Sequence, residues 1–212
     1  MNQLTSKLFF QSRFWFLFIC LNFHLSANAQ TFINFESGAL FTGINDIRNG
    51  NNGTLFSLKN DFSTPVSPFL RLRAGILLNG KNHFSFLYAP LKIVVNGTIE
   101  KKILFDGKDF KANLPIEAIY KFNSYRFTYN RRIIIKDNFK IGLGLSAKIR
   151  DAGVSLKNRE HLRENFSIGF VPLVNLLANW DISQKMGIDF FGEGIIASKG
   201  RAIDLSLSGR YS

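Results

Sequence analysis

Hydrophobic and polar residues alternate with a period of two along most of the chain beyond about residue 30. The clearest case spans 139–150, where the apolar positions are Phe139, Ile141, Leu143, Leu145, Ala147 and Ile149, and the positions between them are Lys140, Gly142, Gly144, Ser146, Lys148 and Arg150. Similar alternation recurs over 166–181 and 203–211. Because successive side chains of a strand point to opposite faces, this period predicts β-strands with one apolar and one polar face.

Clusters of Gly, Asn, Asp, Ser and Pro separate the alternating segments and mark turns. The pattern predicts strands at 32–45, 54–63, 68–78, 83–95, 98–105, 116–134, 139–150, 165–181, 186–196 and 201–211. Several exceed the five or six residues usual in soluble proteins. They reach the 9–11 residues that a strand needs to cross a membrane.

The connections between these strands alternate in length. Long connections are expected at 46–53, 106–115 and 151–164, with 79–82 and 197–200 as short members of the same set, and short turns at 64–67, 96–97, 135–138 and 182–185. Short periplasmic turns and longer exterior loops are typical of bacterial barrels. The fold class predicted is all-β, an antiparallel up-and-down transmembrane β-barrel of about 10 strands (range 8–12), with both termini in the periplasm.

The polar face of the predicted strands carries small residues and charges of both signs, which would fill a narrow lumen and pair across it. The charged members include Arg71, Arg73, Lys148, Arg150, Asp189, Glu193 and Asp204. Aromatic residues lie near the strand ends, where a membrane girdle is expected: Phe69, Phe84, Tyr120, Tyr129, Phe139, Phe166, Trp180 and Tyr211. A soluble exported β-barrel would show the same alternation with the apolar face inward.

The first 29 residues have the three parts of a secretory signal peptide. Lys7 and Arg13 supply positive charge, Phe14 to Leu21 form an apolar run, and Ala27-Asn28-Ala29 is a small-x-small cleavage site. The apolar run is about half the roughly 20 residues of a spanning helix, which argues against an anchor. The expected domains are a signal peptide over 1–29 and an outer-membrane β-barrel over 30–212, located in the cell outer membrane.

The single cysteine, Cys20, falls inside the expected leader. It follows Ile19 rather than a small residue, so we expect no lipidation. Nothing after the leader can form a disulfide or a cysteine-based zinc site.

Four stretches carry a resemblance: FLYAPL (Phe86–Leu91), YKFNSYRFTYNRR (Tyr120–Arg132), AKIRDAGVSL (Ala147–Leu156) and GFVPLV (Gly169–Val174). On these the chain resembles small outer-membrane β-barrel proteins of Gram-negative bacteria, and is similar to a group of uncharacterised exported barrels. The resemblance implies a location and the barrel-assembly machinery as a partner, but no chemistry. Such barrels commonly end in an aromatic residue, whereas here Tyr211 is one place early; a truncated form and a ten-strand variant both fit.

Candidate catalytic groups are few. His161 lies in the longest predicted exterior loop beside Glu160 and Glu164, which is the minimum for a general base. His83 and Ser85 share one strand face. Ordinary solvated or packed histidines explain both sites better, because no nucleophile stands at a defined spacing.

The chain also lacks the motifs of known hydrolases and nucleotide-binding sites. The oxygen-rich loop with Asp46, Asn49, Asn51 and Asn52 could hold calcium weakly, but turn formation accounts for its composition better. The sequence therefore assigns no catalytic, cofactor-binding or metal residues, and no cofactor.

The chain carries a formal net charge of +12 over 212 residues. Its basic residues are spread over strands and loops, without the compact patch that nucleic-acid binding needs. A lumen rich in bases, with the pair Arg131-Arg132, would favour anions, but about ten strands leave no wide channel. We expect outer-membrane lipids and lipopolysaccharide as partners, contacted by the exterior bases Lys108, Lys111, Lys157, Arg159 and Arg163.

The leading functional interpretation is a structural or surface-interaction barrel without turnover. Two alternatives remain: a barrel enzyme acting on lipid or peptide at the outer rim, and a soluble periplasmic β-barrel that binds a ligand. The direction of the apolar strand face separates the soluble alternative from the other two.

Overall fold

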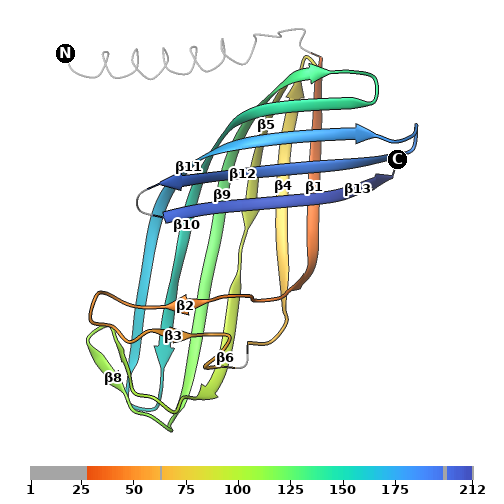
Figure 1. Cartoon of the computed structure of the whole chain (residues 1–212). Coiled ribbons are helices and arrows are strands. Elements are labelled where there is room, and N and C mark those ends of the chain that lie inside the picture. Colours follow the sequence, from red (N-terminus) through yellow and green to blue (C-terminus); the bar gives the residue numbers. More distant parts are fainter. Residues whose placement is uncertain (1–27, 63, 198–199, 212) are drawn as a thin grey trace, which may run out of the picture.

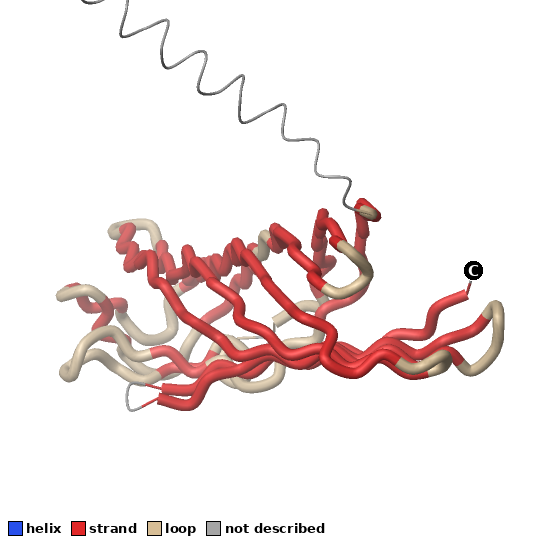
Figure 2. Tube along the Cα trace, turned by 90° about the horizontal axis from the view of Figure 1, so that it is seen from above, coloured by secondary structure: helices blue, strands red, loops and turns tan. Residues whose placement is uncertain are grey.

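The computed structural model describes residues 28–62, 64–197 and 200–211, and its main element is a nine-stranded antiparallel sheet (Figure 1). The strand order is β1-β4-β5-β9-β10-β11-β12-β13, with β6 also paired to β9. The bounds are β1 (Ala29–Leu40), β4 (Ser67–Leu78), β5 (Asn82–Ala89), β6 (Lys92–Thr98), β9 (Pro115–Ile135), β10 (Phe139–Lys157), β11 (Leu162–Asp181), β12 (Met186–Ala197) and β13 (Gly200–Tyr211). The sheet curls and stays open along one side (Figure 2).

Two small hairpins lie outside this sheet. They pair β2 (Asp46–Ile47) with β3 (Phe56–Ser57), and β7 (Ile103–Phe105) with β8 (Lys108–Phe110). In the described part of the chain, no helix is long and apolar enough to cross a membrane.

The predicted fold class is confirmed: all-β, antiparallel, with up-and-down connections in the main sheet. Strands β5 and β6 follow one another along β9 and are separated at Pro90, which has no N–H to donate to a ladder. If β5 and β6 are counted as one interrupted strand, the main sheet has eight strands among the described residues, which is the lower end of the predicted range of 8–12.

Two of the ten predicted strands are wrong. Residues 54–63 and 98–105 contribute only short segments to the small hairpins, and their apolar side chains pack against the sheet instead of extending it. Short apolar runs have no periodicity that tells a strand from a covering loop.

The connections also differ from the prediction. The turns at 79–81, 136–138 and 182–185 join ladder ends at one end of the sheet, so 79–82 belongs to the short set. The long connections, 41–66 and 99–114, lie at the other end. Residues 151–164 are mostly strand, and only 158–161 form a turn.

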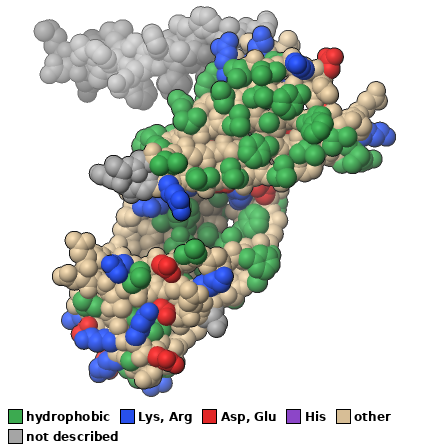
Figure 3. All heavy atoms as spheres, viewed as in Figure 1, with side chains coloured by type: hydrophobic (Ala, Val, Ile, Leu, Met, Phe, Trp, Pro, Cys, Tyr) green, Lys and Arg blue, Asp and Glu red, His purple; other side chains and the backbone are tan. Residues whose placement is uncertain are grey.

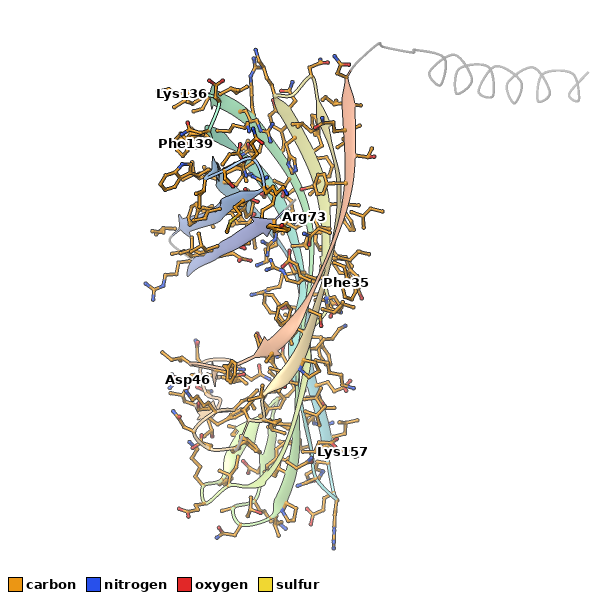
Figure 4. All side chains as sticks on the ribbon, turned by 90° about the vertical axis from the view of Figure 1, so that its right-hand side faces the viewer. Phe35, Asp46, Arg73, Lys136, Phe139 and Lys157 are labelled. Atoms are coloured by element: carbon orange, nitrogen blue, oxygen red, sulfur yellow. The ribbon has the colours of Figure 1, made fainter. Side chains whose placement is uncertain are left out.

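Along part of the sheet, apolar side chains face outward. On β11, Ile168, Phe170 and Val174 are 77%, 67% and 60% exposed, whereas the intervening Asn175 is 1% exposed. Phe35 of β1 points away from the concave side and Arg73 of β4 points into it (Figure 4). This facing is that of a transmembrane barrel, and it is opposite to a soluble one.

The facing reverses farther along the same strands. On β10, Leu143, Leu145 and Ile149 are exposed on the outer face, while beyond Asp151 the inward Val154 and Leu156 are buried. Strand β9 changes in the same way, at Asn123, which pairs with Asp151. We call the part before this level the membrane band and the part beyond it the lobe.

The lobe has its own apolar core. Its members come from the inner face of β6, β9 and β10 and from the two long connections: Phe56, Leu58, Phe62, Ile93, Val95, Ile99, Ile103, Phe105, Phe110, Ile116, Ala118, Val154 and Leu156. Figure 3 shows hydrophobic side chains covering the upper region and charged ones gathered on the lobe below it. The same strands therefore expose an apolar outer face in the membrane band and bury an apolar inner face in the lobe.

Candidate functional site

A cluster of paired charges crosses the concave side of the membrane band, and two of its members, Arg126 and Glu193, are buried. Arg126 of β9 forms an ion pair with Glu193 of β12, and its Nη1 lies 2.9 Å from Oδ2 of Asp204 on β13. Arg71 of β4 bridges Asp204, at 3.6 Å, and Glu36 of β1, at 3.5 Å. The predicted pairing of lumen charges across the barrel is confirmed. These side chains connect strands that are far apart in the sheet and occupy its interior.

An uncharged polar network lies beside this cluster. Asn130 donates to Oδ1 of Asn175 at 2.7 Å, and Asn175 donates to the hydroxyl of Ser146 at 3.0 Å. A Cβ on Gly142 would collide with the Asn130 side chain, so this close approach requires glycine. The small residues of the polar face thus make room for the polar interior.

The two candidate histidines occupy different surroundings. His83 lies on the inner face of β5 and stacks on Phe32, with ring centroids 5.2 Å apart. His161 lies in the 158–161 turn, with its Nε2 3.9 Å from Glu160, and packs edge-on against Phe110 of the lobe core. Ser85 shares the inner face of β5 with His83, and its buried hydroxyl has no hydrogen-bond partner among the described residues.

The oxygen-rich loop follows β1. Its Asp46 belongs to β2, and Oδ1 of Asn49 accepts a hydrogen bond from Asn165 of β11 at 2.7 Å. Over residues 28–62, 64–197 and 200–211, no group of three His, Cys, Asp or Glu side chains is close enough to hold a metal ion.

The bases that the sequence places outside the membrane are spread over the lobe. Lys111 pairs with Glu160 at 3.7 Å, while Lys157 and Arg159 line a shallow pocket of about 340 Å³ that also contains Glu117. Carboxylates thus lie beside several of these bases, and the bases do not form one continuous basic patch.

A different basic site results from an opening in the sheet. Strands β11 and β12 are paired from Asp181 and Gly187 to Val174 and Gly194, and then diverge. From 162 to 173, β11 has β10 as its only strand partner in the described part of the chain, while β12 and β13 continue as a separate hairpin. Figure 3 shows a hollow between the upper region and the lobe. We call this opening the notch.

The notch is a cavity of about 870 Å³. The residues that line it come from the inner face, from the outer face and from the connection 41–66. The inner face contributes Tyr120, Phe122, Lys148, Arg150, Leu173, Glu193, Ile195 and Asp204, the outer face contributes Phe170, Arg201 and Ile203, and the connection contributes Ile44. In a continuous sheet one cavity cannot reach both faces. The notch does so because the wall is open there.

Three cations line the notch. Arg150 and Arg201 have no carboxylate within 4.0 Å among the described residues, and the ammonium of Lys148 lies 5.3 Å from the centroid of the Phe122 ring. An adjoining cavity of about 230 Å³ shares Arg150, Tyr120 and Phe122 and adds Arg48. The two carboxylates of the notch, Glu193 and Asp204, already contact Arg126.

Sequence reasoning missed the notch. The alternation places Lys148 and Arg150 on the polar face, but it gives no sign that β12 leaves β11 partway along. The predicted strand lengths carried the only signal: 116–134 and 165–181 are longer than 186–196 and 201–211, as β9 and β11, with 21 and 20 residues, are longer than β12 and β13, with 12 each.

Comparisons with known proteins add little to this geometry. No model of a known protein family matches the chain, and no curated protein matches it. Among solved structures, the chain is similar to the crystal structure of Ail, the attachment invasion locus protein of Yersinia pestis, in complex with the heparin analogue sucrose octasulfate. The two are 10% identical, the match covers 87% of this chain and 97% of that one, and the TM-score is 0.45.

Proposed function

We propose that this chain is an outer-membrane β-barrel protein that presents its lobe outside the cell as a rigid interaction surface, without catalytic turnover. The observation that carries the proposal is the reversal of facing along β9 and β10 at Asn123 and Asp151. A membrane on one side of this level and water on the other account for both halves of each strand.

The ends of the sheet support the same orientation. The turns at 79–81, 136–138 and 182–185 are short and lie opposite the lobe, as periplasmic turns do in bacterial barrels. Both ends of the described chain, near Ala29 and Tyr211, pair into the ladder on the side of these turns. Trp180 and Tyr211 are exposed there, as interfacial aromatics are.

A leader over 1–29 belongs to this proposal, because a barrel must be exported before it is assembled. Those residues lie outside the described part of the chain, apart from Asn28 and Ala29. The cleavage site predicts a mature protein that begins at Gln30, which mass spectrometry of the membrane fraction would test. Contact with the barrel-assembly machinery is part of the same proposal.

The lobe suits binding better than catalysis. Its inner face is filled by an apolar core, and the lumen beside it is occupied by the Arg126 cluster. His161 packs on Phe110 within the turn that joins β10 and β11. A firm core that holds two long connections in place gives a surface of fixed shape.

Single cysteines test the orientation directly, since Cys20 is the one cysteine of the chain and lies in the expected leader. Lys108→Cys places a thiol on the lobe, and Asp137→Cys places one in a short turn at the opposite end. A membrane-impermeant maleimide should label Lys108→Cys in intact cells and Asp137→Cys only after the outer membrane is opened. The reverse pattern would contradict the proposal.

A further inference from the structure

The notch lies at the end of the membrane band that adjoins the lobe. Arg150 pairs with Gly169 and Ile149 with Phe170, one and two ladder steps from Asp151, where the facing of the strands reverses. A cavity at this level opens toward the boundary between lipid acyl chains and their headgroups. Its ligand can therefore come from the membrane itself.

The lining of the notch is amphipathic. Phe170 and Ile203, 67% and 62% exposed, lie on the face that contacts lipid, while Lys148 and Glu193 lie on the inner face. A ligand that fits both parts has an apolar chain and a polar head. A volume of about 870 Å³ exceeds the space needed by a single small ion and falls in the range of pockets for larger ligands.

The charge of the notch selects an anionic head. Glu193 and Asp204 are engaged by Arg126, which leaves Lys148, Arg150 and Arg201 to face the cavity. Guanidinium groups bind phosphate with two parallel hydrogen bonds, and lysine adds a mobile point charge. Basic pockets in membrane proteins bind phosphorylated headgroups in this way.

We propose that the notch binds a phosphorylated lipid of the leaflet beside the lobe, with its phosphate on Arg150, Lys148 and Arg201 and an acyl chain along Phe170 and Ile203. The identity of the lipid rests on the function proposed above, which makes this the outer leaflet. The phosphorylated lipid there is the lipid A part of lipopolysaccharide. This places the lipid contact at the notch instead of the scattered bases of the lobe.

The test uses the full mature chain, folded in a neutral detergent, with purified lipid A as the probe and native mass spectrometry as the readout. One lipid A should remain bound per chain. Arg150→Gln should weaken binding about tenfold, as expected for the loss of one charged hydrogen-bonded contact. Adding Lys148→Gln should weaken it further. Folding of each variant is checked by its heat-dependent shift on a gel.

The matched control is Lys157→Gln with Arg159→Gln, which removes the same charge from the far end of the lobe. An equal loss of binding in this control would overturn the proposal, because any base would then serve. Phe170→Ser should weaken the binding of lipid A but not that of its deacylated headgroup. If Phe170→Ser has no effect, or weakens the binding of lipid A and of its deacylated headgroup equally, the site for an acylated ligand is refuted.

This experiment is independent of the orientation of the protein in cells, because it is done in detergent. Reversed labelling of Lys108→Cys and Asp137→Cys would remove the outer leaflet and lipid A as the source. Binding that still depended on Arg150 and Phe170 would then support the notch as a lipid site for the opposite leaflet.

Discussion

Placing arginine on the outer face of a strand should be costly in the membrane band and cheap in the lobe. Two valines allow the comparison with one chemical change. Val174 of β11 is 60% exposed and pairs with Leu145, and Val94 of β6 is 39% exposed and pairs with Ile119. Both lie on the outer face of a strand, and Val94 is the less exposed of the two, so burial by the protein alone would make Val94→Arg the costlier change.

The magnitude follows from the depth of Val174. On β10 the membrane band runs from Phe139 to Ile149, and with a rise of about 3.4 Å per residue and a tilt of about 40° it spans roughly 26 Å. Val174, opposite Leu145, is about one residue from the middle of this span. Arginine at the midplane of a barrel costs about 2–4 kcal/mol, so Val174→Arg should destabilise by about 3 kcal/mol. Val94→Arg should change the free energy of unfolding by no more than about 0.5 kcal/mol, as substitutions at a protein surface usually do.

Urea titration of each variant folded into lipid vesicles measures these free energies. Detergent-folded protein provides a second measurement, since a micelle adapts to an added charge better than a bilayer, and the penalty at Val174 should shrink there. Equal costs for Val174→Arg and Val94→Arg in vesicles would refute the membrane band. Equal costs are expected for a soluble barrel, because its apolar face points inward and both valines would then lie in water.

Three further predictions concern the interior and the lobe. Asn175→Ala should destabilise by about 1–3 kcal/mol, because it leaves the buried amide of Asn130 unpaired; urea titration in vesicles reads this out, and a neutral result would contradict the network. Glu193→Gln should cost about 1–3 kcal/mol by the same titration, since it removes one charged partner of the buried Arg126 while Asp204 remains paired with it. Burial raises the pKa of Asp61, but hydrogen bonds from Lys101 and a backbone N–H outweigh it and lower the pKa. Asp61 therefore stabilises the lobe above its unfolded pKa of about 3.9 and loses this contribution as the pH falls through the lowered folded value; proteolysis of the lobe should distinguish Asp61→Asn from the native chain at pH 7 but not at pH 2.

Much of the fold was predictable because most strands alternate strictly. The period of two identifies which positions of β10, β11, β12 and β13 share a face, and the facing of 165–181 is as expected. The alternation places Asn175 on the polar face, but in the structure this residue is 1% exposed and its amide is bonded to Asn130 and Ser146. A polar face seen in sequence does not show whether water or packed side chains lie against it.

The lobe was missed, for a physical reason. The alternation changes phase at Asp151, where the apolar positions pass from odd numbers (Leu145, Ile149) to even ones (Val154, Leu156), and the predicted strand ends at this break although β10 continues to Lys157. The apolar runs that cover the lobe, at 54–63 and 98–105, then resemble strands themselves. Of the predicted aromatic girdle, Tyr120 faces inward and packs on the lobe core, which only the reversal explains.

The continuity of β9 and β10 determines how the lobe can work. Because these strands run through the membrane band and into the lobe without a break, the lobe cannot rotate on a linker as a separate domain would. The notch lies at the same level, where the shorter β12 and β13 leave the longer β11. An opening that arises from unequal strand lengths persists without any conformational change. A lipid bound there would fill the open wall between the lobe and the β12–β13 hairpin. The proposed interaction surface and the proposed lipid site thus depend on one feature of the fold: strands that are too long for the membrane lie beside strands that just cross it.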